Sequence, residues 1–284
     1  MISITNQQLS VRIKPRGAEL CSLRNAEGVE YLWQADSSVW GRHAPVLFPI
    51  VGKLRDNRYE LNGKHYTLSQ HGFARDMDFE LIEQTGSSAV FQLLPTADTR
   101  SVYPFEFDLK IIYRLNNSTL EIEYTVGNNG ASAMPFSIGA HPGFLLPGPI
   151  ENCFLDFETT ETLNARLLSP NGLLSETAVP VLNESNRLPL NGHLFDRDAL
   201  IFPECQSERI TLGSAKHPRH LRVEFPGFPN LGIWSKPGAP FVCIEPWFGF
   251  ADPEQPYGEL PKKPGIQNLP VGQTFSCIHR ISIG

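Results

Sequence analysis

The sequence predicts an all-β protein, a large antiparallel β-sandwich with few short helices. Two observations lead to this fold class. Apolar residues alternate with polar ones along much of the chain, and no window of 11 or more residues keeps a helical apolar face free of glycine and proline. The 284 residues include 23 glycines and 24 prolines, which a helical bundle does not tolerate, yet the apolar share of 41% suffices for a packed core.

The clearest strand is predicted over 105–115, where alternate residues are apolar and most of those between them are charged. A turn at 116–118 leads into 120–126, so these segments are expected to form an antiparallel hairpin. Asn62-Gly63 predicts a second, tight hairpin between 59–61 and 64–66, because both turn residues tolerate positive φ. Alternation and flanking turn residues predict further strands over 2–5, 9–14, 18–24, 78–83, 88–94, 151–158, 209–213, 221–225, 231–235, 240–245 and 274–282.

No fixed-period repeat and no linker divides the chain, so residues 1–284 are expected to form a single domain. The segment 251–270 contains five prolines and is predicted to be a long surface loop. Loops of this kind often cover a binding site.

Charge and motifs exclude several classes of function. The net charge is −6 and the basic residues are scattered, which argues against nucleic-acid binding and favours a small-molecule ligand. No apolar stretch reaches about 18 residues and no export signal is recognisable, so a cytoplasmic protein without membrane spans is expected. The chain lacks nucleotide-binding glycine motifs, the zinc-protease motif and the serine-hydrolase motif.

Five cysteines, an odd number without a C-x-x-C pair, argue against both a disulfide framework and a zinc site. They are expected to be reduced and buried, and no metal or other cofactor is predicted. The positions are Cys21, Cys153, Cys205, Cys243 and Cys277.

Three short polar islands remain as candidate functional segments, at 70–75, 140–144 and 243–247. His71 and His141 each stand next to glycine or proline and near a phenylalanine, at expected loop or strand ends. Because imidazole titrates near neutrality, the two histidines are candidates for proton transfer; the alternative is that each merely completes a turn.

The third island contains a carboxylate after an apolar run. Glu245 follows Phe-Val-Cys-Ile, and burying a carboxylate there costs energy unless the group is paired or used. A buried carboxylate has a raised pKa, which suits a general base, whereas an edge-strand glutamate would face water. Trp247 offers an aromatic face for a sugar ring. Cys243 is a candidate nucleophile beside His141, or inert packing.

Two further groups are candidates for ligand contact. Asp196 and Asp198 precede an apolar strand, where either can bind ligand hydroxyls or simply form a turn. Arg75 can grip a hydroxyl pair or, together with Lys53 or Arg55, a phosphate; it can equally be an ordinary surface arginine.

Taken together, the three islands and the segments 15–20, 30–34 and 45–52 resemble the aldose 1-epimerase (galactose mutarotase) family. The resemblance covers about residues 10–280, with the segments in the family's order. It implies a large antiparallel β-sandwich of the galactose mutarotase type, which binds sugars and interconverts the α and β anomers of aldoses without a cofactor.

The resemblance also implies roles for individual residues. Glu245 would be the base that takes the anomeric hydroxyl proton, His141 the acid that protonates the ring oxygen, and His71 a second histidine at the ring. Asp198 matches the family's sugar-hydroxyl aspartate. Arg75 resembles the substrate-binding arginine of hexose-6-phosphate mutarotases. His-Gly-Phe-Ala-Arg in place of His-Gly-Gly places the sequence nearer that phosphosugar branch.

The expected substrate is therefore a hexose or a hexose 6-phosphate, handled by a monomer or homodimer. Two alternatives remain at this stage. A sugar-binding protein on the same scaffold would need the sugar contacts but not the acid–base pair. A glycoside hydrolase would use Glu245 and Asp198 as paired carboxylates, at a separation that indicates its stereochemistry.

Overall fold

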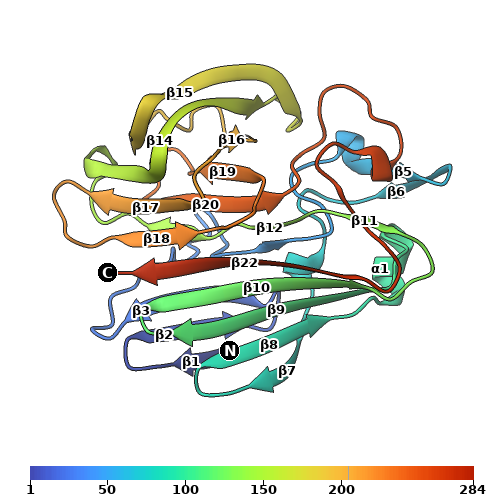
Figure 1. The fold of residues 1–284 in the computed structure, drawn as a ribbon, viewed down its shortest axis with the longest axis horizontal. Coiled ribbons are helices and arrows are strands. Elements are labelled where there is room, and N and C mark those ends of the chain that lie inside the picture. The colour runs from blue at the N-terminus through green and yellow to red at the C-terminus, as the bar shows by residue number, and fades with distance from the viewer. Residues whose placement is uncertain (204) are drawn as a thin grey trace.

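The computed structural model describes residues 1–203 and 205–284, and antiparallel strands make up most of it (Figure 1). The largest sheet has 15 strands, in the order β4-β12-β20-β19-β16-β14-β17-β18-β22-β10-β9-β8-β7, with β13 paired to β20 and β15 to β14. Its strands are β4 (Val46–Leu47), β7 (Glu80–Gln84), β8 (Ser88–Leu93), β9 (Phe107–Asn116), β10 (Thr119–Asn128), β12 (Ile138–Ala140), β13 (Gly143–Leu145), β14 (Cys153–Leu168), β15 (Leu174–Pro189), β16 (Leu200–Phe202), β17 (Arg209–Ser214), β18 (Leu221–Glu224), β19 (Asn230–Trp234), β20 (Phe241–Phe248) and β22 (Thr274–Ile283).

Three smaller sheets complete the strands. They pair β1 (Ile2–Thr5), β2 (Leu9–Lys14) and β3 (Glu19–Asn25); β5 (Arg58–Leu61) and β6 (Lys64–Thr67); and β11 (Met134–Phe136) and β21 (Gln267–Leu269). The one α-helix among the described residues is α1 (Ala97–Val102), which Thr96 and Thr99 close with a capping box. Four 3₁₀ turns are η1 (Arg55–Asn57), η2 (Ala74–Asp76), η3 (Ile150–Asn152) and η4 (Leu260–Lys262).

The core lies between packed sheets. In Figure 1 the β1–β3 sheet lies behind β22, β10, β9 and β8. Val11 and Ile13 of β2 belong to the same buried cluster as Leu109 and Ile111 of β9. Alternate residues of β9 are buried, as the sequence pattern indicates. The predicted all-β fold with few short helices is confirmed.

The predicted hairpins are confirmed as well. β9 pairs with β10 from Phe107 opposite Asn128 to Asn116 opposite Thr119. β5 and β6 flank a turn in which Asn62 and Gly63 both have positive φ.

Several strands were not predicted from the sequence, or were predicted too short. β14 extends to Leu168, ten residues beyond its predicted end, and β15 was not predicted at all. Only three of the sixteen β15 residues are buried, and the β14–β15 pairing contains four register shifts, so no regular alternation survives in the sequence. The helix α1 and the short strands β4, β11, β12 and β13 were also missed, because two to six residues are too few to show a period.

The prediction of one continuous loop over 251–270 is wrong. The segment contains η4 and the strand β21, which pairs with β11. Lys263 and Asp252 anchor it from inside, as a buried pair with Nζ and Oδ1 3.0 Å apart. Within the described chain, no helix has the length and apolar character needed to cross a membrane.

Candidate active site

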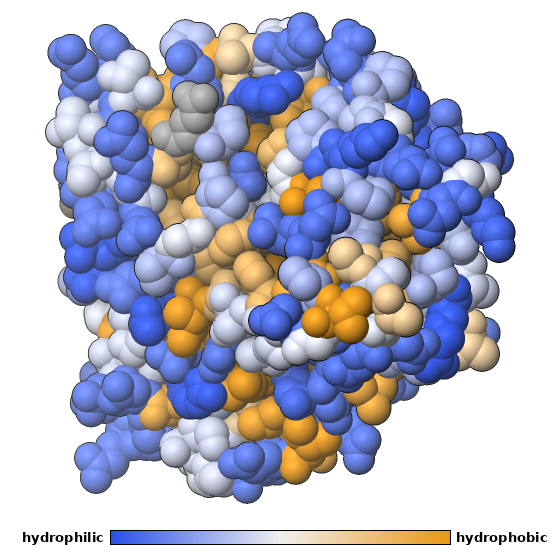
Figure 2. Space-filling view, turned by 45° about the vertical axis from the view of Figure 1, so that its right-hand side comes forward, coloured by the Kyte–Doolittle hydropathy of each residue, from blue (hydrophilic) through white to orange (hydrophobic). Residues whose placement is uncertain are grey.

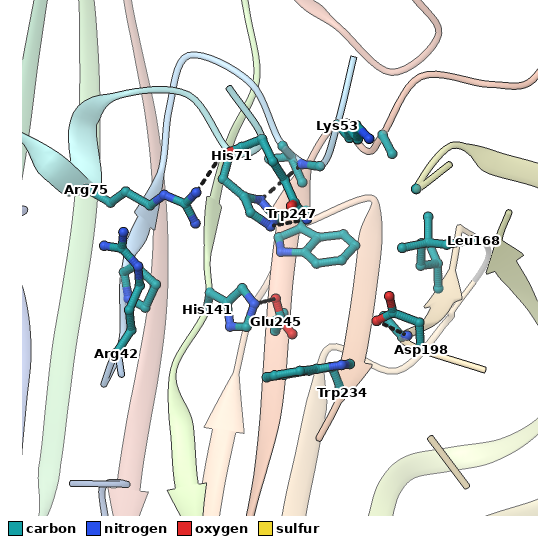
Figure 3. A pocket seen from close by; sticks show the side chains of 18 of the residues that line it. Arg42, Lys53, His71, Arg75, His141, Leu168, Asp198, Trp234, Glu245 and Trp247 are labelled. Atoms are coloured by element: carbon teal, nitrogen blue, oxygen red, sulfur yellow. Dashed lines mark hydrogen bonds and ion pairs between the residues drawn. The ribbon is translucent and has the colours of Figure 1, made fainter. Parts of the chain in front are cut away.

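A pocket of about 300 Å³ is lined by most of the candidate residues of the sequence analysis. Strand β20 contributes Glu245 and Trp247 to its wall, and other strands and several loops complete the lining (Figure 3). Hydrophilic side chains cover most of the face in Figure 2, and hydrophobic ones show between them, some in recesses and some at the surface. The predicted residues in the pocket are His71, Arg75, His141, Asp198, Glu245 and Trp247.

Strand β20 forms one wall of the pocket. Its side chains alternate: Val242 and Ile244 belong to the main core, whereas Cys243, Glu245 and Trp247 lie on the opposite face. Glu245 is only 1% exposed. It is the one carboxylate of β20, whose other side chains are apolar and mostly buried.

Trp247 lies flat within the wall. A Cβ atom on Gly139 of β12 or on Gly232 of β19 would come within 2.4 Å and 2.3 Å of the indole ring, so both positions require glycine. The ring nitrogen Nε1 donates to the carbonyl oxygen of Ala140 at 3.2 Å. The orientation of the indole is therefore fixed by its neighbours before any ligand arrives.

His141 stands next to Glu245. Its Nε2 atom lies 3.2 Å from Oε2 of Glu245, and the side chain of His141 is 12% exposed. The ring stacks on Trp40, with centroids 5.0 Å apart, and meets the edge of Trp234 at 5.8 Å. These aromatic contacts hold the imidazole beside the carboxylate (Figure 3).

Burial governs the protonation of this pair. It raises the pKa of Glu245 well above its usual range, with the charge of Asp198 adding to the effect, and it lowers the pKa of His141 to about 3. Both shifts oppose separate charges in a dry site. Together the two shifts favour a protonated Glu245 beside a neutral His141 when no ligand is bound.

His71 approaches the same pocket from the loop after β6. Its Nδ1 accepts a hydrogen bond from the backbone N–H of Gly52 at 3.1 Å, so the neutral ring carries its proton on Nε2. Burial, followed by the charge of His141, lowers the pKa of His71 well below its usual value. The two imidazoles lie edge to face with centroids 5.7 Å apart. His71 is thus suited to donating a hydrogen bond while neutral.

Charged side chains form the rim. Arg42 and Arg75 lie on one side of the His141–Glu245 pair in Figure 3. Nη2 of Arg42 is 2.9 Å from Oδ1 of Asp76, and Nε of Arg75 is 3.7 Å from Oδ2 of the same residue. One carboxylate thus faces two guanidinium groups, and Lys53 adds a third cation elsewhere in the lining. The rim carries an excess of positive charge.

Asp198 lies on the opposite side of the pocket from the arginines (Figure 3). Its Oδ1 accepts from the backbone N–H of Ala199 at 2.8 Å, and its φ is +72°. Asp196, the other candidate, is exposed and pairs with His193 at 2.9 Å outside the pocket lining. Of the two aspartates, only Asp198 is placed to contact a ligand.

Sequence reasoning did not single out Trp40, Arg42 or Trp234, all of which line the pocket. Trp40 and Arg42 lie in an irregular loop, where no periodicity marks a residue as facing a site. The scarcity of tryptophan, four in 284 residues, was the one available signal. Arg55 is absent from the lining; its guanidinium binds the backbone carbonyl of Pro253 instead.

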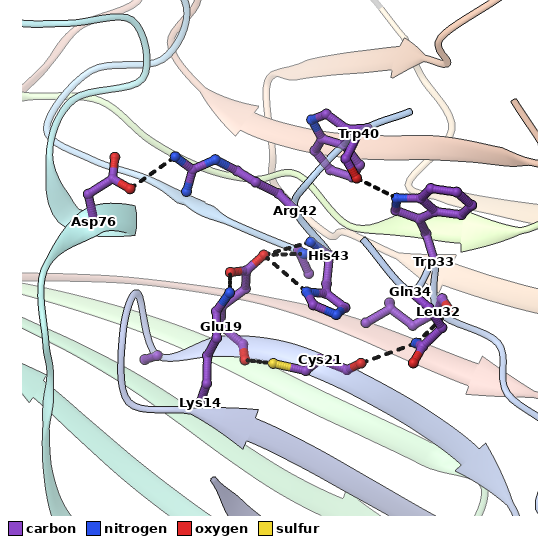
Figure 4. Close-up of polar contacts among 12 residues, drawn as sticks. Lys14, Glu19, Cys21, Leu32, Trp33, Gln34, Trp40, Arg42, His43 and Asp76 are labelled. Carbon is purple, nitrogen blue, oxygen red and sulfur yellow. Dashed lines mark hydrogen bonds and ion pairs between the residues drawn. The ribbon is translucent and has the colours of Figure 1, made fainter. Parts of the chain in front are cut away.

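The loop that carries Trp40 and Arg42 is supported by the buried carboxylate of Glu19 (Figure 4). Oε1 of Glu19 accepts from the backbone N–H groups of His43 and Ala44, at 2.7 and 3.0 Å, and Oε2 lies 2.5 Å from Nζ of Lys14. Although burial opposes its ionisation, hydrogen bonds from His43 and Lys14 lower the pKa of Glu19 to about 2. Trp40 is held in place by a hydrogen bond of 2.8 Å that Nε1 of Trp33 donates to its backbone carbonyl oxygen.

Comparison with known proteins identifies the family. The family model described as aldose 1-epimerase matches residues 1–267. The LacX protein of Lactococcus lactis subsp. lactis is 34% identical over 281 residues, 94% of each chain. A galactose mutarotase related enzyme from Lactobacillus acidophilus is 36% identical with a TM-score of 0.95, over 100% of this chain and 97% of that one. A galactose mutarotase-like protein from Lactobacillus casei is 33% identical with a TM-score of 0.95, over all of both chains. The family model and these relatives agree with the observed fold, and the chain belongs to the aldose 1-epimerase family.

Proposed function

We propose that residues 1–284 form one domain that catalyses aldose mutarotation, the interconversion of α and β anomers, on a hexose or hexose 6-phosphate. The observation that carries this proposal is the contact of 3.2 Å between His141 and Glu245 at the dry wall of the pocket. Mutarotation needs a base at the anomeric hydroxyl and an acid at the ring oxygen at the same time, and this pair supplies one of each.

The reactive form carries the shared proton on His141. Glu245 then takes the proton from the O1 hydroxyl while Nε2 of His141 gives its proton to the ring oxygen O5, and the C1–O5 bond breaks. Rotation about C1–C2 presents the other face of the aldehyde, and the reverse transfers close the ring. Because both transfers occur together, no full charge develops on the sugar.

The other pocket residues bind the sugar in this scheme. Nε2–H of neutral His71 donates to a sugar oxygen, the carboxylate of Asp198 accepts from sugar hydroxyls, and Trp247 lies against the ring. Cys243 takes no part, because it is fully buried and burial raises the pKa of its thiol well above the usual range.

The charge of the rim favours a phosphorylated sugar. Two adjacent guanidinium groups that share one carboxylate leave a net positive charge for an anion, and arginine binds phosphate oxygens in bidentate geometry. Lys53 in the same lining adds to this field. The hydroxyl groups of a neutral hexose can accept hydrogen bonds from these arginines, but they carry no charge to balance the field.

Polarimetry tests the proposal directly. Freshly dissolved α-D-glucose, α-D-galactose and α-D-glucose 6-phosphate are followed with wild-type protein and with the double variant His141→Asn/Glu245→Gln. We expect the wild type to accelerate equilibration above the spontaneous rate, most strongly for the phosphorylated sugar, and the double variant to fall to the spontaneous rate. Glu83→Gln, a change of the same chemistry at an exposed position of β7, is the matched control.

A wild type that binds these sugars without accelerating their equilibration would contradict the proposal and favour a non-catalytic sugar-binding protein. Faster equilibration of the free hexoses than of glucose 6-phosphate would overturn only the assignment of the rim to phosphate.

A further inference from the structure

His141 and Glu245 of the pocket lining form a cluster with Cys243, a buried residue behind them that mutarotation leaves unused. The ligand atoms of His141, Cys243 and Glu245 all lie within 4.8 Å of one another. Cys243 and Glu245 are two residues apart on β20 and share a face, and His141 follows β12, the strand paired with β20. The fold thus brings together three groups of metal-ligating type that no close spacing in the sequence marks as a metal site.

The chemistry of the set matches one class of metal ion. Thiolate, imidazole and carboxylate are the ligands that zinc takes in proteins, and sites with three protein ligands leave a fourth position open. Ideal zinc bond lengths place neighbouring ligand atoms about 3.4–3.6 Å apart. Nε2 of His141 and Oε2 of Glu245, at 3.2 Å, are already close to this separation, so only the sulfur has to approach.

A second observation points to a ligand at this position. Oε2 of Glu245 is buried and meets no donor in hydrogen-bond geometry among the described residues, despite its closeness to the imidazole. A buried carboxylate oxygen without a partner is costly, and a cation would satisfy it. The open fourth position would face the pocket, because His141 and Glu245 both line it.

Charge balance also favours a divalent ion. The thiol loses one proton and the His141–Glu245 pair loses the proton it shares, so that two protons leave to solvent for each ion bound. The cluster is neutral before and after the exchange. A dry wall therefore gains no net charge when the metal enters.

We propose that His141, Cys243 and Glu245 form an inhibitory zinc site, which blocks the acid–base pair when it is occupied. The inhibition rests on the proposed function, whereas the binding of the ion does not. Zinc at this site removes the proton that mutarotation uses and occupies both catalytic groups. Cys243 takes no part in proton transfer. In this proposal it makes the active site sensitive to metals that bind thiols.

Cobalt(II) is the spectroscopic probe for this site. Titrating wild-type protein with Co²⁺ is expected to produce a near-ultraviolet thiolate-to-cobalt charge-transfer band and visible bands of a four-coordinate ion, both removed by one equivalent of Zn²⁺. The thiolate band reports only a cysteine ligand, so weak binding at exposed histidines does not interfere. Cys243→Ser and Cys243→Val are both expected to lack the band, and Cys277→Ser, at a buried thiol outside the cluster, to keep it.

The inhibition is measured separately, as mutarotation rate against Zn²⁺ concentration. Loss of an outer-shell partner alone weakens metal binding by ~10–100-fold, so loss of the thiolate is expected to raise the inhibitory concentration by at least ~100-fold in both Cys243 variants. Circular dichroism establishes that each variant is folded. A wild type without the cobalt thiolate band, or a band that persists in the folded Cys243 variants, would overturn the site. A wild type that binds cobalt but shows no mutarotation would instead contradict the proposed function.

Discussion

The wall and the rim of the pocket are built in different ways. The wall consists of strand residues such as Glu245 of β20 and of His141, which directly follows β12 and stacks on Trp40. The rim consists of Arg42, Arg75 and Asp198, which come from loops or a short 3₁₀ turn and keep contact with solvent. Burial changes the proton affinities at the wall, whereas the rim presents charge. We infer that the wall carries the reaction and the rim selects the substrate.

Removing the acid from the wall is expected to have the largest effect on the rate. His141→Asn keeps a polar side chain but cannot protonate the ring oxygen. We expect kcat to fall by about 10²–10⁴-fold, the contribution of one positioned acid, with KM changed by less than ~3-fold. Polarimetric initial rates over a range of sugar concentrations measure both constants. An effect confined to KM would assign His141 to binding and contradict the division between wall and rim.

The sequence revealed some residues of both the wall and the rim, and it missed others in each. Glu245 stood out because a carboxylate ends an apolar run, and the β9–β10 hairpin stood out because its alternation is regular over ten residues. Trp40 and Arg42 had no such signal, since loop residues are placed by tertiary contacts such as those of Glu19. The closeness of His141 and Cys243 likewise depends on strand pairing over a long separation in sequence, which no local pattern encodes.

The second way to sharpen the comparison is to weaken the support beneath the rim. Glu19→Gln removes a buried negative charge. In the wild type this carboxylate pairs with Lys14 and accepts hydrogen bonds from the backbone N–H groups of residues 43 and 44. The pKa of Glu19 is about 2 in the folded protein and near 4.5 when unperturbed, so its ionisation stabilises the folded state by about 3 kcal/mol at pH 7. We expect the variant to lose stability of this order.

The pH dependence of this loss follows from the direction of the shift. Because the folded-state pKa is lowered, the stabilisation is fully present above pH 4.5 and disappears as the pH falls toward 2. The difference in unfolding free energy between wild type and Glu19→Gln, from urea denaturation, should therefore shrink over this range. Glu83→Gln serves as the control, and a difference that stays constant with pH would show that packing, not ionisation, explains the loss.

Replacing the arginines of the rim is expected to lower kcat/KM for phosphorylated sugars only. Charge-assisted hydrogen bonds contribute about 1.5–3 kcal/mol, so the double variant Arg42→Gln/Arg75→Gln should lose ~10–100-fold in kcat/KM for a hexose 6-phosphate. The rate with a free hexose should remain within ~3-fold of the wild type. Equal losses for both sugars would mean that the arginines shape the pocket and do not read a phosphate.

The smallest expected effect is at Asp198. Asp198→Asn keeps the acceptor for the N–H of Ala199 and weakens only the bond to a sugar hydroxyl. A neutral hydrogen bond in place of a charged one costs about 1 kcal/mol, so KM should rise by ~5-fold with kcat nearly unchanged. Asp196→Asn, outside the pocket, is the matched control, and a larger effect there than at Asp198 would reverse the assignment of the two aspartates.

The most direct test of the wall as the site of reaction is anomeric exchange at equilibrium, observed by NMR magnetisation transfer between the α and β anomeric protons of a saturating sugar. The account expects exchange above the spontaneous rate with wild type and none above it with Glu245→Gln, while line broadening shows that the variant still binds the sugar. Exchange at the wild-type rate in Glu245→Gln would contradict the account, because the carboxylate would then not be the base.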